Sequence, residues 1–260
     1  MSYNGPMNNF IPYGKQSISD DDIQSVVKIL NSDYLTQGPT TKNFESQISK
    51  YVNSKFAVTV NSATSALHIA CLALDVKKND IVWTSPITFV ASANCALYCK
   101  ANIDFVDIEL TTGLISINKL EEKLKVAKKN KKLPKVLIPV HLAGSSCDMK
   151  KIYELSIKYN FKIIEDASHA IGGKYKNHKV GCCKYSNITI FSFHPVKIIT
   201  TGEGGAATTN DKDLAEKMFQ LRSHGITKEE SKFLVDSPPP WHYEQQLLGF
   251  NYRMNDIQAA

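Results

Sequence analysis

The amino-acid sequence predicts an α/β fold in which a mostly parallel sheet is covered by helices on both faces. Between residues 56 and 222, short β-rich runs alternate with segments whose apolar residues recur at helical spacing. Small, hydroxyl-bearing or acidic residues follow several of these runs, at the edge where such sheets place their ligands. A ligand-binding or catalytic α/β domain is therefore expected.

Length and composition fit this fold. The 260 residues can hold one large α/β domain, or one domain and the beginning of another. The hydrophobic fraction of 43% and the charged fraction of 22% are those of an ordinary globular protein. Much of the net charge of +6 comes from a lysine-rich run at 123–135. Because this run contains no aromatic residue, we expect a solvated helix end and loop there rather than a nucleic-acid site.

The six cysteines form no CxxC pair, so reduced and mostly buried thiols are expected in a chain of this size. Cys95 and Cys99 stand four apart on an expected helix, but no histidine cluster accompanies them, which favours core packing over a metal site. The first residues lack a basic region followed by an apolar stretch, so no signal peptide is expected. No run approaches about 18 apolar residues, and we expect a cytoplasmic protein without a membrane span.

The chain should begin with an arm and two helices. Residues 1–16 are expected to form the N-terminal arm. Ser19, followed by three aspartates, starts the first helix, because acidic side chains favour the positive end of the helix dipole. A second helix is expected after Gly38-Pro39. One large domain is expected to span residues 17–250. Strands are then expected at 56–60, 80–84, 103–108, 136–141, 161–166, 188–191 and 204–209, with helices that include 116–129 and 211–222, and with a surface loop at 228–243.

The connection after the first strand, Asn61 to Ser65, consists of small and hydroxyl residues in front of a helix. Unpaired amides at a helix N-terminus attract anions, and hydroxyl groups add donors, so this turn is a candidate phosphate site. A plain helix cap explains the same residues. Phe89 is expected at the C-terminal end of the next strand, where an aromatic residue either stacks on a planar ligand or belongs to the core.

The strand at 161–166 ends in Glu165 and Asp166, and His169 follows three residues later. A carboxylate at a strand end can hold the ring nitrogen of a ligand in its protonated form. The alternative is that Asp166 caps the next turn and that His169 is a surface histidine.

Lys197 lies between the strands expected at 188–191 and 204–209, in an apolar and hydroxyl-rich connection without a carboxylate within five residues on either side. Burial without a partner lowers the pKa of a lysine and favours the neutral amine. Neutral amines form Schiff bases with carbonyl compounds and with pyridoxal phosphate. An exposed loop lysine is the alternative.

These features follow one another in a specific order: the hydroxyl turn, the aromatic strand end, a Glu-Asp-Ala-x-His strand end, a Ser-x-x-x-x-Lys connection and Gly-Glu-Gly-Gly. In this order they resemble the sugar aminotransferases of the DegT/DnrJ/EryC1/StrS family, from Ile11 to the last residue. The resemblance implies the large domain of a type I aminotransferase that depends on pyridoxal phosphate, with a mostly parallel seven-stranded sheet between helices. Five stretches look closer still to family members of pseudaminic acid biosynthesis: Ile11–Gln16, Thr36–Pro39, Pro86–Asn94, Pro139–Gly144 and Arg222–Ile226.

The resemblance implies a role for each candidate residue. Lys197 would be the Schiff-base lysine and the acid–base group, Asp166 would pair with the pyridine nitrogen, and His169 would lie beside the phenolic oxygen of the cofactor. A histidine replaces the lysine in dehydratase relatives, so Lys197 argues for amino transfer. The other candidates would bind the cofactor: Phe89 by stacking on its ring, Ala63, Thr64 and Ser192 by contacting its phosphate, and Asn251 by reaching the phosphate of the neighbouring subunit.

The implied reaction moves an amino group from L-glutamate to C4 of a UDP-linked 4-keto-6-deoxy-N-acetyl sugar, in a homodimer with composite active sites. The family continues into a small C-terminal domain, so residues 251–260 are expected to start the connection to it, and the sequence is expected to be a fragment. Two alternatives remain, namely transfer to another 4-keto sugar nucleotide, such as the GDP-linked precursor of perosamine, and an inactive protein that only binds pyridoxal phosphate. A Rossmann-type protein fits the α/β pattern but not the chain, which lacks a GxGxxG turn after its first strand.

Overall fold

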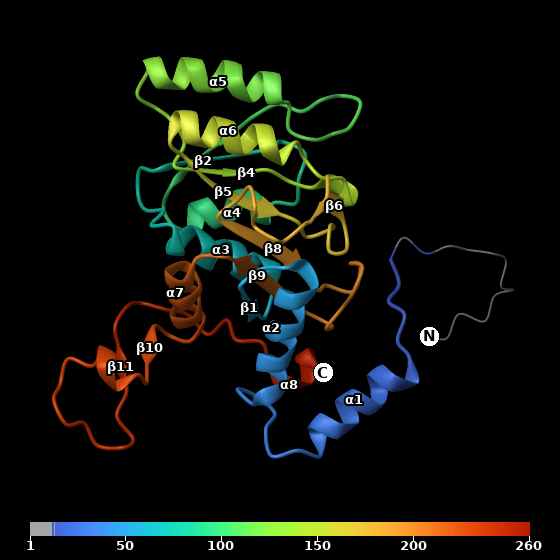
Figure 1. The fold of residues 1–260 in the computed structure, drawn as a ribbon, viewed down its shortest axis with the longest axis vertical. Coiled ribbons are helices and arrows are strands. Elements are labelled where there is room, and N and C mark those ends of the chain that lie inside the picture. Colours follow the sequence, from blue (N-terminus) through green and yellow to red (C-terminus); the bar gives the residue numbers. More distant parts are fainter. Residues whose placement is uncertain (1–11, 13) are drawn as a thin grey trace, which may run out of the picture.

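The main sheet of the protein has seven strands: β1 (Phe56–Val60), β2 (Ile81–Thr84), β3 (Asn102–Phe105), β4 (Val136–Ile138), β5 (Lys162–Asp166), β8 (Ile188–Ser192) and β9 (Gly205–Thr209). Their order across the sheet is β1-β9-β8-β5-β4-β2-β3 (Figure 1). In this computed structural model, which describes Pro12 and residues 14–260, β9 runs antiparallel to β1 and β8, and the other neighbours pair in parallel. The predicted seven-stranded, mostly parallel sheet is confirmed, whereas most of the predicted arm at 1–16 lies outside the described residues.

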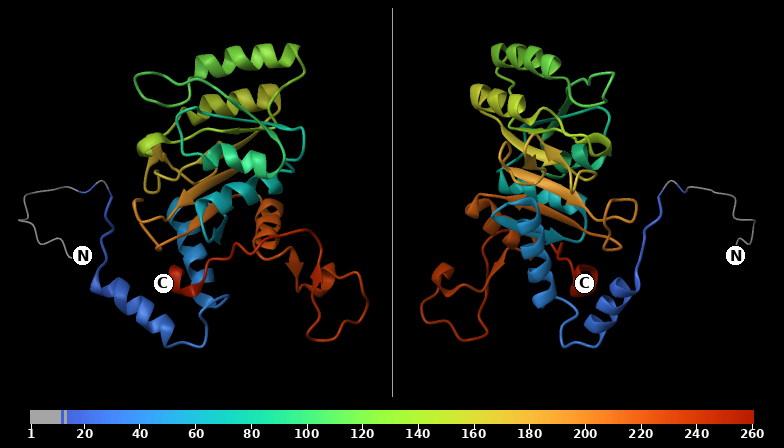
Figure 2. Two further views of the ribbon diagram at one scale, coloured as in Figure 1. Left: turned by 180° about the vertical axis from the view of Figure 1, so that it is seen from behind. Right: turned by 45° about the vertical axis from the view of Figure 1, so that its right-hand side comes forward.

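Helices cover both faces of the sheet (Figure 1, Figure 2). One face carries α2 (Pro39–Val52), α5 (Ile117–Lys129) and α6 (Met149–Tyr159). The other face carries α3 (Ala63–Ala73), α4 (Ala91–Tyr98) and α7 (Lys212–Arg222). The remaining elements are α1 (Asp20–Leu30), α8 (Asp256–Ala259), the 3-10 turns η1 (Leu142–Gly144) and η2 (Glu230–Lys232), and two small hairpins, β6 (Lys174–Tyr175) with β7 (His178–Lys179) and β10 (Ile226–Thr227) with β11 (Glu244–Gln245).

Burial explains the apolar patterns of these elements. All five residues of β8 are buried, as expected for a central strand with helices on both sides. Helix α3 is wedged between the sheet, α4 and α7, so residues on nearly every side of it are apolar and buried. Helix α5 buries a single stripe that includes Leu120 and Leu124, and the lysines of the 123–135 run are partly or fully exposed.

Two strands are shorter than the sequence predicts. The strand predicted at 136–141 ends at Ile138, because Pro139 has no N–H to donate to a ladder. The strand predicted at 103–108 ends at Phe105, and the chain then pairs with itself through a bridge between Ile108 and Ile115. Both differences lie at strand ends, where pairing continues only through isolated contacts such as the bridge between Val140 and Asp166.

The last residues return to the first helices. Helix α2 has no side-chain cap of its own at Gly38, and the buried carboxylate of Asp256 supplies one from the other end of the chain. Its oxygens accept from the amide of Gly38 at 2.7 Å and from the amide of Thr41 at 2.9 Å. This places α8 beside α1 and α2 (Figure 1). Within the part of the chain that the structure describes, every helix is too short or too polar to span a bilayer.

Candidate active site

The Lys197 amine lies 2.6 Å from Nε2 of His169. Lys197 belongs to the loop between β8 and β9, and His169 to the turn after β5. Because β5 and β8 are parallel neighbours, both loops leave the sheet at the same edge. The structure thus brings together two side chains that are 28 residues apart in the sequence and that the resemblance assigned to one site.

The electrostatics of this pair favour a neutral amine. Burial lowers the pKa of Lys197 below its ordinary value, and the negative charge of Asp166 partly opposes this change. Burial and the nearby charge of Lys197 lower the pKa of His169 as well. The lowered pKa of His169 favours its neutral ring, and the tautomer of that ring decides which partner donates in the hydrogen bond with the Lys197 amine. A neutral amine is the form of lysine that attacks a carbonyl carbon.

We expect Lys197 to react with pyridoxal phosphate at lower pH than an exposed lysine does. A lowered pKa makes the neutral, reactive amine available at lower pH, so the rate should rise through a midpoint below the ordinary lysine value. Borohydride trapping over a range of pH values, followed by peptide mass mapping, measures this midpoint. Lys162, an exposed lysine at the start of β5, is the internal control. Asp166→Asn should lower the Lys197 midpoint further, and equal midpoints for the two lysines would contradict the prediction.

Asp166 ends β5 and is only 5% exposed. Its Oδ2 accepts a hydrogen bond of 2.6 Å from the hydroxyl of Ser92 on α4. Its Oδ1 accepts from the hydroxyl of Ser168 at 2.7 Å and from the amide of Ser168 at 3.2 Å. Three donors therefore bind the two oxygens of Asp166, a pattern that suits an ionised carboxylate. An anion fixed next to Lys197 can keep a cationic ring nitrogen protonated.

The hydroxyl turn before α3 is both a helix cap and an open helix N-terminus. Ser62 Oγ accepts from the amide of Ser65 at 3.1 Å, and Ser65 Oγ donates to Oδ1 of Asn61 at 2.7 Å. Ala63 and Thr64 form the start of the helix and are half-buried. Amides at this position have no partner within their helix, so the cap leaves them available to an anion.

Strand β9 passes close to this turn. It pairs with β8, the strand that ends in Ser192, which is the third residue predicted to contact the phosphate. Ser192 pairs with Gly205 in the ladder between β8 and β9. A Cβ at Gly205 would lie 2.5 Å from the amide nitrogen of Ala63 and 2.7 Å from its Cα, a contact that backbone atoms cannot avoid. Glycine at 205 is therefore required, and the residue that pairs with Ser192 in the ladder lies against the start of α3.

Phe89 and Asn251 lie at the margins of this cluster. Strand β2 ends at Thr84, so Phe89 sits in the following loop rather than at the strand end, with 73% of its surface exposed. Asn251 is exposed, and its backbone forms an isolated bridge with Ser223. The next carbonyl, that of Tyr252, accepts from the amide of Asn61 at 2.8 Å, so this segment lies against the phosphate turn of its own chain. The stacking role of Phe89 and the contact of Asn251 with a second subunit remain predictions.

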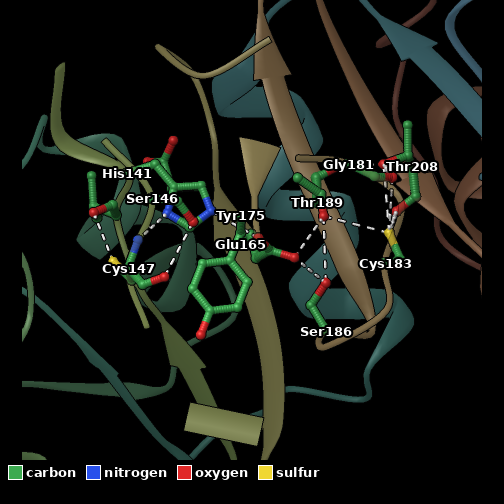
Figure 3. A network of polar contacts seen from close by, with 12 residues as sticks. His141, Ser146, Cys147, Glu165, Tyr175, Gly181, Cys183, Ser186, Thr189 and Thr208 are labelled. Atoms are coloured by element: carbon green, nitrogen blue, oxygen red, sulfur yellow. Dashed lines mark hydrogen bonds and ion pairs between the residues drawn. The ribbon is translucent and has the colours of Figure 1, made fainter. Parts of the chain in front are cut away.

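A buried polar network joins His141, Glu165 and Thr189 beside the end of β5 (Figure 3). His141 Nδ1 accepts from the amide of Cys147 at 3.2 Å, so Nε2 carries the proton and donates to Glu165 at 2.7 Å. Burial opposes ionisation of Glu165, but this donor, together with Ser186 and Thr189, holds the pKa of the carboxyl below its ordinary value. The amide of His141 also donates to the carbonyl of Asp166 at 2.9 Å. The network therefore fixes where β5 ends.

Sequence reasoning missed the residues that hold Asp166. Ser92 and Ser168 donate hydrogen bonds to its carboxylate oxygens, and the amide of His141 donates to its backbone carbonyl. The sequence contains a recognisable pattern for Ser92 and for Ser168. Ser92 is a polar residue on the apolar face of a helix, and Ser168 stands two residues after an aspartate, the spacing at which Asp side chains accept local hydrogen bonds. No local pattern pairs His141 with Glu165, because their contact depends on the sheet register.

The cluster fits pyridoxal phosphate. It offers a lysine amine with a lowered pKa for the aldehyde, a buried carboxylate for the ring nitrogen, and a helix N-terminus with hydroxyl groups for the phosphate. The described residues hold no group of three or more His, Cys, Asp and Glu side chains suited to a metal ion. Cys95 and Cys99, which are 0% and 7% exposed, pack in the core as predicted.

The loop from Lys197 to Gly202 also borders a cavity of about 980 Å³. Parts of α1, α2 and α8 form its other walls. Its size lies at the upper end of the range for small-molecule sites, about 300–1,000 Å³. A large substrate therefore has room next to the lysine loop.

Comparisons with known proteins identify the family of the chain. The sequence pattern of the DegT/DnrJ/EryC1/StrS aminotransferase family matches residues 16–260. The chain is 42% identical, over 96% of its length, to a UDP-4-amino-4,6-dideoxy-N-acetyl-β-L-altrosamine transaminase from Campylobacter jejuni, of which it covers 62%.

Solved structures share the fold. The aminotransferase PseC of pseudaminic acid biosynthesis from Helicobacter pylori superimposes with a TM-score of 0.83 at 34% identity, over 95% of this chain and 62% of that one. A putative sugar aminotransferase from Streptococcus pneumoniae, in its pyridoxal-phosphate form, gives a TM-score of 0.81 at 29% identity, over 96% of this chain and 64% of that one.

The chain spans less than two thirds of the length of these relatives. The matched part contains the whole seven-stranded sheet and every candidate residue of the site. The protein therefore belongs to the DegT/DnrJ/EryC1/StrS aminotransferase family, whose members are nucleotide-sugar aminotransferases that depend on pyridoxal phosphate.

Proposed function

We propose that this chain is the cofactor-binding large domain of an aminotransferase that moves an amino group from L-glutamate to C4 of UDP-2-acetamido-2,6-dideoxy-β-L-arabino-hex-4-ulose. The observation that carries amino transfer is the cluster of Lys197, His169 and Asp166 beside the N-terminus of α3. The sugar rests on the 42% identity to the Campylobacter jejuni transaminase. Its name places an amino group at C4 of a 6-deoxy sugar, and the acceptor for such a transfer is the corresponding 4-ketone.

Each side chain of the site has its own role in the proposed reaction. Nζ of Lys197 would hold the aldehyde group of the cofactor, and the same amine would accept and return a proton at the reacting carbon. Asp166 would keep a proton on the ring nitrogen of the cofactor, and Nε2 of His169 would orient the Lys197 amine through their 2.6 Å hydrogen bond. Pyridoxal phosphate, when bound, supplies the electron sink that both half-reactions need. The amides of Ala63 and Thr64 and the hydroxyl of Ser192 would hold its phosphate.

The active form would be a homodimer in the cytoplasm. Asn251 is exposed next to the phosphate turn, where it is free to contact a second subunit. The six free cysteines, five of them buried, suit a reducing compartment. Sedimentation that finds a stable, active monomer would exclude a composite site.

A visible absorption spectrum of the purified chain with pyridoxal phosphate tests amino transfer. We expect a visible band that depends on Lys197 and that bleaches when L-glutamate is added, because the amino group then passes to the cofactor. L-Aspartate and L-alanine serve as alternative donors. A folded chain that shows no band would contradict the proposal, and a band that persists with glutamate would contradict the choice of donor.

The choice of sugar has its own test. The protein carrying the donated amino group is mixed with the UDP-linked 4-keto sugar or, as the rival acceptor, with the GDP-linked 4-keto precursor of perosamine. Return of the visible band with the UDP sugar alone is the expected result. Return with the GDP sugar alone would assign the protein to the rival reaction.

A further inference from the structure

Ser92 is the residue on α4 that touches Asp166. It is fully buried in the first turn of the helix, and its hydroxyl lies 2.6 Å from Oδ2 of Asp166. The two residues are 74 positions apart, so only the packing of α4 on the sheet brings them together.

The direction of each hydrogen bond in this contact is fixed. An ionised carboxylate only accepts, so the Ser92 hydroxyl donates its single proton to Asp166. Thr88 Oγ1 lies 2.8 Å from the Ser92 hydroxyl and must therefore be the donor in that bond. The result is a relay that runs from Thr88 through Ser92 to Asp166.

The relay leaves one acceptor position on the carboxylate. Each oxygen has two lone pairs in the plane of the group. In the described part of the chain, the hydroxyl and the amide of Ser168 use both positions of Oδ1, and Ser92 uses one position of Oδ2. The second lone pair of Oδ2 is the one that remains for an N–H donor.

Ser92 also holds the loop that carries Phe89. The amide of Ser92 donates to the carbonyl of Phe89 at 3.2 Å, while its side chain bonds to Asp166. Ser92 thus joins the side chain of Asp166, which is proposed to face the ring nitrogen, to the backbone of Phe89, whose side chain is proposed to stack on the ring.

We propose that Ser92 is a positioning residue for amino transfer, which, with Thr88 behind it, directs the free lone pair of Asp166 Oδ2 toward the ring nitrogen of pyridoxal phosphate and so keeps that nitrogen protonated. This inference rests on the proposed function. Without the serine hydroxyl, the carboxylate can rotate away from the ring nitrogen. A carboxylate that has lost a donor also binds a proton more tightly. Both effects move the shared proton away from the ring.

The test is a pH titration of ¹⁵N-ring-labelled pyridoxal phosphate bound to the 260-residue chain, because the ¹⁵N chemical shift reports the ring proton directly. In Ser92→Ala the loss of this proton should move to lower pH by about one unit, the scale of one hydrogen bond to a charged group. Ser92→Thr keeps the hydroxyl and should titrate like the natural chain. Thr88→Val removes only the second member of the relay and should give a smaller shift in the same direction.

Ser156→Ala is the matched control. Ser156 is a buried helical serine on α6, and its hydroxyl donates to the carbonyl of Tyr153 at 2.7 Å, far from Asp166 in the fold. This variant should lose a comparable amount of stability and leave the ¹⁵N titration unchanged. A general packing defect would affect Ser92→Ala and Ser156→Ala alike.

The outcomes separate this inference from the function on which it rests. A labelled cofactor that binds the natural chain with a protonated ring, and titrates identically in Ser92→Ala, overturns the role of Ser92 and leaves amino transfer in place. A natural chain that does not bind the cofactor overturns both. A shift in Ser92→Ala and Thr88→Val, without one in Ser156→Ala, supports the relay.

Discussion

Replacing Lys197 with alanine should abolish the visible band with pyridoxal phosphate and lower amino transfer by about 1,000-fold or more, because one side chain supplies both the covalent attachment and the proton transfer. Two features of the structure distinguish Lys197 from an exposed lysine. Burial lowers the pKa of Lys197, and its amine already points to His169 at 2.6 Å. The measurement is the absorption spectrum, together with steady-state transfer from L-glutamate.

Lys162→Ala is the control for this variant. Lys162 is exposed at the opposite end of β5 from Asp166, so its loss should change neither the band nor transfer. Thermal unfolding of both variants shows whether the fold is kept, and a half-buried loop lysine should be removable without unfolding. An unchanged spectrum in Lys197→Ala would show that a different lysine binds the cofactor.

The reasons why the sequence singles out Lys197 and Asp166 as candidates are local. Asp166 follows a run of apolar residues that only a buried strand explains, and Lys197 stands in a connection without nearby carboxylates. Alternation of strand and helix then predicts that both lie at one edge of a parallel sheet, which the order β8-β5-β4 confirms. The sheet and most helix boundaries follow from such patterns, because burial on one or both faces leaves a periodic trace in the sequence.

The contacts among the candidate residues leave no such periodic pattern in the sequence. The distance between Lys197 and His169, the bond from Ser92 to Asp166 and the pairing of His141 with Glu165 each join separate elements. They depend on strand order and on how α4 sits against the sheet, which residue periodicity does not encode. The same holds for Phe89, whose distance from the strand end depends on where Thr84 stops pairing.

Replacing Asp166 with asparagine should separate cofactor attachment from catalysis. The amide has nearly the shape of the carboxylate but no charge, so it cannot keep a ring nitrogen protonated. Lys197 keeps its half-buried place and a still lower pKa, because the charge that opposed the shift is gone. We therefore expect the visible band to form, while amino transfer falls by about 100-fold or more, as when a preorganised electrostatic partner is removed.

Asp107→Asn is the matched control for Asp166→Asn. Asp107 is an exposed aspartate just beyond the end of β3, whose carboxylate accepts from the amide of Ile108 at 2.8 Å. Its loss removes the same charge near the same edge of the sheet without touching the cluster. Full transfer in Asp107→Asn, together with the loss in Asp166→Asn, would show that the position of the charge matters and not its presence at that edge. If Asp166→Asn kept full transfer, the ring nitrogen would have to be protonated by another group, and neither Asp166 nor its relay from Ser92 would have the role proposed for it.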